Sequence, residues 1–283
     1  MRRTVPSSIT TAVVCMAAVI AALVASTRAD ALTFASRAGS PQASSNWAGY
    51  AASAPAGTAV NFTDVTGTWV QPKIRCVKGR ADAAAFWVGL GGLSTSSQSL
   101  EQLGTSAQCN GSSATAAYDV WWEIIPAAAV HVPLKVMPGD KLSAAVLVNA
   151  QRVALSVKSL TRGWHFSKTI TVGHALDVSS AEWVAEAPTS CTSSSSCRLV
   201  TLADFGQVVF ADAATTGNGH PGTLVDPTWI ASPIDLVSRG FSSSLLGRGA
   251  AVSGDSGALP GQLAADGRGF TVTWQQNVAQ PIP

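Results

Sequence analysis

Short apolar runs separated by turn residues follow one another along most of the chain. The clearest example is the Pro-Gly-Asp turn within 137–140, which opens into the apolar, β-branched run 141–148. Further runs follow at 153–158 and 166–172, and an Asp-Gly turn precedes the alternating run Phe270–Trp274. Long helical periodicity is hard to find, and nine tryptophans can fill a wide interior. The pattern therefore predicts an all-β, two-sheet antiparallel β-sandwich whose central runs form a meander.

The N-terminal residues have the three-part layout of a secretory signal. Two arginines follow Met1, an apolar stretch runs from Ile9 to Ala25, and the small-residue sequence Ala-Asp-Ala comes next. We expect residues 1–29 to be a signal peptide, 30–43 a short disordered or pro-segment, and 44–283 one domain. A permanent membrane anchor is the alternative, because the apolar stretch approaches the length that spans a bilayer. No second such stretch follows, so we expect a secreted, extracellular protein without membrane association after signal removal.

Charged residues are scarce, at 12% of the chain. Removing the signal takes away Arg2, Arg3 and Arg28 and no acid, which leaves 15 basic residues against 16 acidic ones and a net charge of −1. No Lys/Arg cluster that could neutralise phosphates remains, so no nucleic-acid partner is expected. We expect a monomer.

Four cysteines remain once Cys15 is removed with the signal, and an even number in an exported protein indicates two disulfides. Only a Thr-Ser-Ser-Ser-Ser loop separates Cys191 from Cys197, so a local bridge is favoured there, and it leaves Cys76 to pair with Cys109. A zinc site is the alternative, but no histidine lies at ligand spacing from either pair.

Two strand-like segments carry acids and aromatic residues at alternate positions. Residues two apart share a face of a strand, so Glu182, Val184 and Glu186 point one way. The same rule places Asp119, Trp121 and Glu123 together. A protein core would not collect carboxylates, so this face is predicted to be a substrate groove. Outward, solvated faces are the alternative interpretation.

Five segments carry distinctive short motifs: Ser45–Tyr50, Phe86–Gly92, Leu100–Thr105, Tyr118–Pro126 and Ala181–Glu186, the last followed by Cys191 and Cys197. Together they resemble the motifs of the glutamic peptidases, also called eqolisins or the G1 peptidase family, and they occur in the family's order. Each motif alone is weak evidence, and the specificity lies in the set. The resemblance covers 44–197 well and the C-terminal strands less distinctly.

The resemblance implies a concanavalin A-like sandwich, a secreted acid endopeptidase acting on proteins or peptides, and a Gln/Glu dyad without metal or other cofactor. Carried over by motif, the dyad is Gln102 with Glu186, the second acid of Ala-Glu-Trp-Val-Ala-Glu. Trp47, Trp87 and Glu123 match positions that line or support the cleft, and Glu182 is expected to be structural or at its rim. Glu101 is expected to face away from Gln102.

Such a pair suits hydrolysis by direct attack of water. A carboxylate can take a proton from water and return it to the leaving nitrogen, while a carboxamide donates hydrogen bonds to the oxyanion at any working pH. An unperturbed Glu has a pKa near 4.3, so the dyad predicts that activity is highest at acidic pH.

One position departs from the family pattern. Where Trp-Val-Gly-x-Asp-Gly is usual, this chain has Gly91 in place of Asp. If the Asp of the family pattern orients the dyad or tunes its pKa, a chain without it has a shifted pH optimum or is a catalytically impaired homologue.

Two other functions compete with the peptidase. The segment 253–257 contains Gly-Asp-Ser-Gly, the string around the nucleophile of chymotrypsin-like proteases, but no histidine stands in the setting that a serine mechanism needs, which favours a flexible loop. A carbohydrate-binding or glycoside-hydrolysing sandwich is the second alternative. A glycosidase needs two carboxyl groups, whereas the dyad pairs one with the carboxamide of Gln102.

Overall fold

A computed structural model describes residues 39–193, 196–237 and 256–276. The predicted signal, most of the predicted 30–43 segment, and Gly254 and Asp255 lie outside these ranges. The described residues form strands, turns and loops and contain no helix, so none of them forms a helix able to cross a membrane. The all-β prediction is confirmed.

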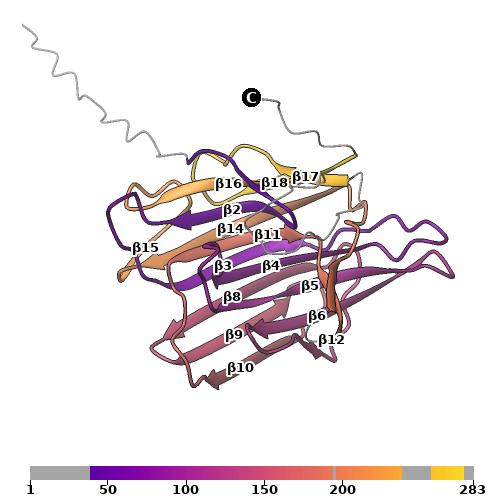
Figure 1. Cartoon of the computed structure of the whole chain (residues 1–283), viewed down its shortest axis with the longest axis horizontal. Helices are drawn as coiled ribbons and strands as arrows, with labels where there is room; N and C mark the ends of the chain where they lie inside the picture. Colours follow the sequence, from indigo (N-terminus) through magenta and orange to yellow (C-terminus); the bar gives the residue numbers. More distant parts are fainter. Residues whose placement is uncertain (1–38, 194–195, 238–255, 277–283) are drawn as a thin grey trace, which may run out of the picture. The chain divides into compact units, whose positions relative to one another are not determined.

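The strands form two layers (Figure 1). One layer contains, in spatial order, β10 (His165–Thr171), β9 (Arg152–Ser159), β8 (Lys141–Asn149), β3 (Phe62–Val70), β14 (Gln207–Gly217) and β18 (Phe270–Gln276). The other contains β16 (Ile230–Leu236), β2 (Trp47–Ser53), β11 (Ser180–Glu186), β4 (Ala83–Gly91), β5 (Leu100–Asn110), β6 (Thr115–Ile124) and β7 (Val130–Val132). Strand β17 (Ser256–Pro260) pairs with both β16 and β18 and joins the layers.

Four short strands lie outside the two rows of strands given above. Strand β1 (Gln42–Ser44) runs parallel to β16, β15 (His220–Gly222) pairs with β14, and β12 (Thr189–Ser193) pairs with β13 (Ser196–Leu199). Gln42 and Ala43, which the sequence pattern assigns to the segment before the domain, are thus part of the sheet.

The predicted meander is present as β8, β9 and β10, which pair in succession. The predicted turn at Asp266–Gly267 precedes β18, and Gly267 has a φ of +68°, a conformation that glycine adopts without strain.

The main core lies between the layers. Alternate residues of β4, β5 and β11 point into it, among them Phe86, Leu103 and Trp183, and they pack towards β3 and β8. A Cβ at Gly67 would lie 2.9 Å from the Trp183 ring, so glycine there lets the indole reach the backbone of β3 and donate to the Thr66 carbonyl over 2.7 Å. The residues in between on β4, β5 and β11 point to the opposite face, which carries the candidate site.

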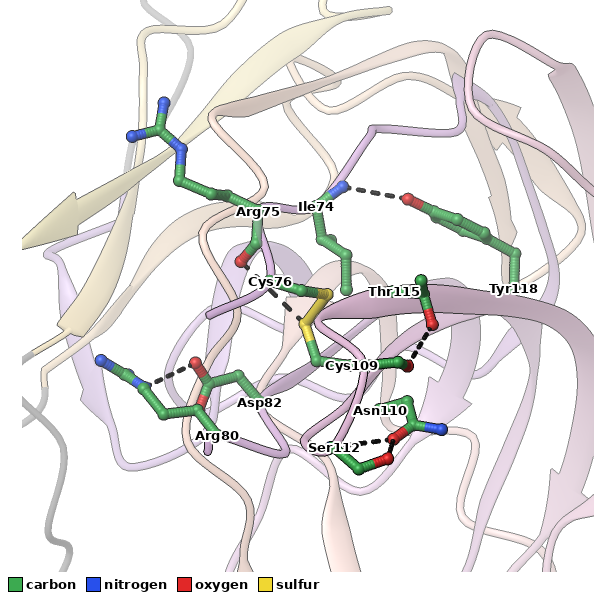
Figure 2. Close-up of a disulfide and its surroundings, with 11 residues drawn as sticks. Ile74, Arg75, Cys76, Arg80, Asp82, Cys109, Asn110, Ser112, Thr115 and Tyr118 are labelled. Atoms are coloured by element: carbon green, nitrogen blue, oxygen red, sulfur yellow. Dashed lines mark hydrogen bonds and ion pairs between the residues drawn. A yellow bond between two sulfur atoms is a disulfide. The ribbon is translucent and has the colours of Figure 1, made fainter. Parts of the chain in front are cut away.

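The predicted Cys76–Cys109 disulfide is confirmed (Figure 2). It joins the loop after β3 to β5, and the Ile74 amide in the same loop donates to the Tyr118 hydroxyl of β6 over 3.2 Å. The backbone register also places Cys191 opposite Cys197. The side chain of Cys191 lies outside the described part, so the second disulfide stays a prediction.

Candidate active site

Four neighbouring strands align their side chains in rows on the face that points away from the main core. Each row takes one residue from β11, β4, β5 and β6 in turn. The rows are Glu182–Gly89–Gln102–Glu123, Val184–Trp87–Gly104–Trp121 and Glu186–Ala85–Ser106–Asp119. The predicted sharing of one face by Glu182, Val184 and Glu186, and by Asp119, Trp121 and Glu123, is confirmed.

Gly89 separates Glu182 from Gln102 in the first row. A Cβ at position 89 would lie 3.2 Å from the Cβ of Gln102 and 2.9 Å from the ring of Trp87. With strands ~4.8 Å apart, the Cα atoms of Glu182 and Gln102 are roughly 10 Å apart. Gly89 itself has no side chain, and the edge of the Trp87 indole lies over it, so the carboxyl group and the carboxamide stand on either side of that edge.

The amide of Gln102 is held on one side only. Its Nε2 donates to Oε2 of Glu123 over 2.7 Å, while its Oε1 is buried without a hydrogen-bond partner among the described residues. Burial raises the pKa of Glu123, and the hydrogen bond from Gln102 lowers it in part. Nε2 carries a second hydrogen, so the amide keeps one donor and one acceptor for a ligand.

Glu182 is fully buried, and neither carboxyl oxygen has a hydrogen-bond partner among the described residues. Burial raises the pKa of Glu182 well above its ordinary value. The nearby hydroxyl of Ser180 lowers it, and the charges of Asp177 and Glu101 raise it further. A buried carboxyl without partners is costly, which is typical of a group that serves a ligand or a reaction.

Glu186 has partners of its own. Its carboxylate accepts hydrogen bonds from Trp87 Nε1 over 2.7 Å and from Asn46 Nδ2 over 3.0 Å. Burial raises the pKa of Glu186 to about 7, these two hydrogen bonds lower it in part, and the charge of Glu123 raises it.

The register does not bring Glu186 and Gln102 together as the sequence analysis expects. Glu186 lies opposite Ala85, four residues along β4 from Gly89, so its Cα is roughly 16 Å from that of Gln102. The indole of Trp87 fills the interval, since its N–H reaches Glu186 and its far edge lies over Gly89. Glu182, predicted to be structural or at the rim, takes the place beside Gln102. Both acids share a face, so alternation alone could not distinguish them.

The other predicted residues line the same face. Trp47 lies edge-to-face against Trp87 with ring centroids 5.0 Å apart, and Trp121 contributes a buried N–H that has no partner among the described residues. Glu101 pairs with Leu90 and points to the other face, as predicted. Burial raises the pKa of Glu101 to about 7.

The family profile described as the Peptidase A4 family matches residues 45–240, which is more than half of the chain and includes every residue of the three rows. The chain belongs to the peptidase A4 family. The predicted membership of the glutamic peptidases is thereby confirmed, and the family assignment favours a peptidase over the carbohydrate-directed alternatives.

Solved structures agree with the fold of this A4 family peptidase. A crystal structure of Scytalido-glutamic peptidase with a peptide-based transition state analog has a TM-score of 0.62 at 21% identity, covering 82% of this chain and 98% of the other. SCP-B, a member of the eqolisin family in complex with the tripeptide Ala-Ile-His, has a TM-score of 0.60 at 20% identity with the same coverage. At these identities the likeness establishes the β-sandwich fold. No curated protein matches the chain significantly.

The described residues of the peptidase contain no group of three or more His, Cys, Asp or Glu side chains placed to hold a metal ion. The polar groups on the site face include carboxyls, the Gln102 amide, the Trp121 N–H and the Ser106 hydroxyl, which donates to Asp119.

Proposed function

We propose that the chain is a secreted endopeptidase that hydrolyses peptide bonds by direct attack of water, with Glu182 as general acid/base and Gln102 as oxyanion donor. The observation that carries this proposal is the row Glu182–Gly89–Gln102, in which buried, unpartnered carboxyl and amide oxygens flank a position without a side chain. The proposal replaces Glu186 with Glu182 as the acid of the sequence-predicted dyad.

The chemistry needs only these two groups and a water molecule. Ionised Glu182 takes a proton from the water molecule while the water oxygen attacks the peptide carbonyl carbon, and the carbonyl oxygen becomes an oxyanion. The free N–H of Gln102 Nε2 donates to that oxyanion. Protonated Glu182 then gives its proton to the leaving nitrogen, the C–N bond breaks, and a carboxylic acid and an amine are released.

The neighbouring residues support the pair in this proposal. Glu123 fixes the rotamer of Gln102 by accepting its first N–H, and Trp47, Trp87 and Trp121 provide an apolar wall that limits water near the reacting groups. Glu186 fixes the orientation of the Trp87 indole by accepting a hydrogen bond from the indole N–H. Protein and peptide substrates agree with the peptide-like ligands named for the related crystal structures.

Secretion is supported by the N-terminal pattern of arginines, apolar residues and Ala-Asp-Ala. The confirmed Cys76–Cys109 disulfide agrees with export to an oxidising compartment.

Digestion of a denatured protein across a pH series tests the assignment with Glu182→Gln, Gln102→Ala and Glu186→Gln. We expect Glu182→Gln to lose at least ~10³-fold in kcat, because the proposed base is removed. Gln102→Ala should lose ~10²- to 10³-fold, the usual effect of removing one oxyanion donor. Glu186→Gln should keep measurable turnover. The reverse result, with Glu186→Gln inactive and Glu182→Gln active, would restore the dyad inferred from the sequence.

A further inference from the structure

Gly91 ends β4 two residues beyond Gly89 and has a φ of +81°. A Cβ at position 91 would lie 2.3 Å from the carbonyl oxygen of Asp177 and 3.0 Å from its Cβ. No real Cβ tolerates a backbone atom at 2.3 Å, so Asp177 occupies the space that a side chain at 91 would need. The residue that departs from the family pattern is thus matched by an acid from the loop between β10 and β11.

The loop carboxylate is held in place by several donors. Asp177 accepts hydrogen bonds from the Gly92 amide over 3.3 Å, from the Ser179 amide over 2.9 Å and from the Ser97 hydroxyl. Its own amide donates to Ser99 Oγ over 2.7 Å. These bonds tie the loop to the end of β4 and to the segment before β5.

Asp177 keeps its charge in this setting. Burial raises its pKa, but the hydrogen bonds from Ser179, Ser97 and Gly92 outweigh that effect, so the pKa is lowered. The carboxylate also borders a surface hollow lined by serines, which gives it access to solvent. It is therefore ionised under conditions where the buried Glu182 is neutral.

Two carboxyl groups raise the pKa of Glu182 through their charge. Asp177 lies on the loop that leads into β11, and Glu101 lies on β5. No Lys, Arg or His in the described part of the chain forms an ion pair with any of these three acids. No cation therefore offsets the negative charge of Asp177, and that charge disfavours ionisation of Glu182.

We propose that Asp177 is a positioning residue of the hydrolytic site: a negative charge that the β10–β11 loop holds beside the end of β4, where Gly91 leaves room for the Asp177 backbone, and that acts on the reaction through Glu182. The inference rests on the proposed role of Glu182. It assigns to Asp177 the task that the family pattern would give to an acid at position 91.

The pH dependence of kcat/KM tests the inference with Asp177→Asn, which keeps the size and an acceptor oxygen but removes the charge. The acid limb of kcat/KM reports the pKa of the base in the free enzyme. Removing a nearby negative charge makes Glu182 easier to ionise, so we expect this limb to move to lower pH by roughly 0.5 unit or more.

Asp226→Asn is the matched control. Asp226 is also a loop acid with a lowered pKa, it accepts hydrogen bonds from the amide and hydroxyl of Thr228, and it lies outside the site. The acid limb of kcat/KM for Asp226→Asn should superimpose on that of the wild type. Ser97→Ala removes one donor and leaves the charge of Asp177, so its limb should move less than that of Asp177→Asn.

A titration by ¹³C NMR separates this inference from the proposed function, because it needs no turnover. The Glu182 carboxyl signal is assigned by its loss in Glu182→Gln, and thermal unfolding confirms that each variant is folded. A lower Glu182 pKa in Asp177→Asn supports the inference even if no substrate is cleaved. An unchanged Glu182 pKa and an unchanged acid limb in folded Asp177→Asn would show that Asp177 only shapes its loop.

Discussion

Gln102 has one fixed neighbour and one open side. Glu123 accepts one of its N–H hydrogens, and the other side of the amide faces Glu182 across Gly89. A catalytic amide must present its donor in one orientation before the oxyanion forms, because reorientation during the reaction would weaken its stabilisation. Glu123 thus contributes to the site by orienting the Gln102 amide through a single hydrogen bond.

Glu123→Gln should weaken this arrangement without removing Gln102. Replacing the carboxyl acceptor weakens the hydrogen bond that orients Gln102 by about 1.5 kcal/mol, so kcat should fall about tenfold with KM little changed. Steady-state kinetics on a peptide substrate measures both quantities. Asp64→Asn, which changes a half-buried carboxyl of β3 in the other layer, is the control and should retain wild-type kcat. Equal losses in both variants would contradict a specific role for Glu123.

Gly89→Ala tests the position between Glu182 and Gln102. The added Cβ would lie 2.9 Å from the Trp87 ring and 3.1 Å from the Glu101 carbonyl oxygen, so ring and backbone must shift. We expect a stability loss of about 1–3 kcal/mol and a fall in kcat larger than that loss explains, because the new methyl group enters the space between acid and amide. Thermal unfolding and kinetics should be compared with Gly173→Ala, where a Cβ meets nothing within 4 Å.

At the scale of elements, β4 is the strand on which the site is organised. It pairs with β11 on one side and β5 on the other, so it fixes the register between the strand that carries Glu182 and the strand that carries Gln102. The Cys76–Cys109 disulfide fastens the loop after β3 to the far part of β5, and Tyr118 ties the same loop to β6. These links hold β5 and β6 in place at the end remote from Gln102.

Replacing Cys76 and Cys109 by alanine should destabilise the fold. The disulfide closes a loop with a sequence separation of 33, for which chain entropy predicts a loss of about 3–4 kcal/mol. Denaturant unfolding measures the loss. The Cys191→Ala/Cys197→Ala variant would open a much shorter loop and should lose less, and thiol titration of the denatured mature protein should find no free thiol if the second predicted disulfide forms. A larger loss in the second variant would contradict the entropic explanation.

At the scale of the whole molecule, the layer that carries the site buries several carboxyl groups in neutral form. Burial raises the pKa of Glu101 and of Glu186 to about 7, and that of Glu182 well above its ordinary value of 4.5. The folded protein therefore binds protons between pH 4.5 and 7 that the unfolded chain has released. The stabilisation is fully present below the unfolded pKa and is lost as the pH rises through the folded pKa.

We accordingly expect the protein to be most stable in acid and to lose stability from pH 4.5 to beyond 7. Glu101 and Glu186 each contribute on the order of 3 kcal/mol. Thermal unfolding between pH 3 and pH 8 measures this, and Glu101→Gln should flatten the decline because a neutral amide does not ionise. A melting temperature that rises across this range would contradict the prediction.

The same carboxyl groups are expected to set the pH range in which the protein is active. With Glu182 as the proposed base, its raised pKa is expected to place the acid limb of kcat/KM above the pH of about 4 that an unperturbed Glu would give. The loss of folding stability towards neutral pH limits activity on the alkaline side of the profile. The expected profile is a bell in the mildly acidic range, less acid than the sequence alone suggested.

Several features of the protein follow from its amino-acid sequence by itself. Turn residues between apolar runs predicted the strands of the β8–β10 meander and the start of β18, because these signals act over a few positions. Alternation predicted that Glu182 and Glu186 share one face, and cysteine spacing predicted Cys76–Cys109. The set of motifs identified the family.

Only the tertiary structure decided which acid stands beside Gln102. A period of two assigns a side chain to a face of a strand, but it leaves open which residue of the neighbouring strand lies opposite. Hydrogen bonding of β4 with β11 and β5 fixes that choice and sets Glu182, not Glu186, across Gly89. The relation of Gly91 to Asp177 is of the same kind, because it joins positions far apart in sequence whose fit depends on where a loop packs.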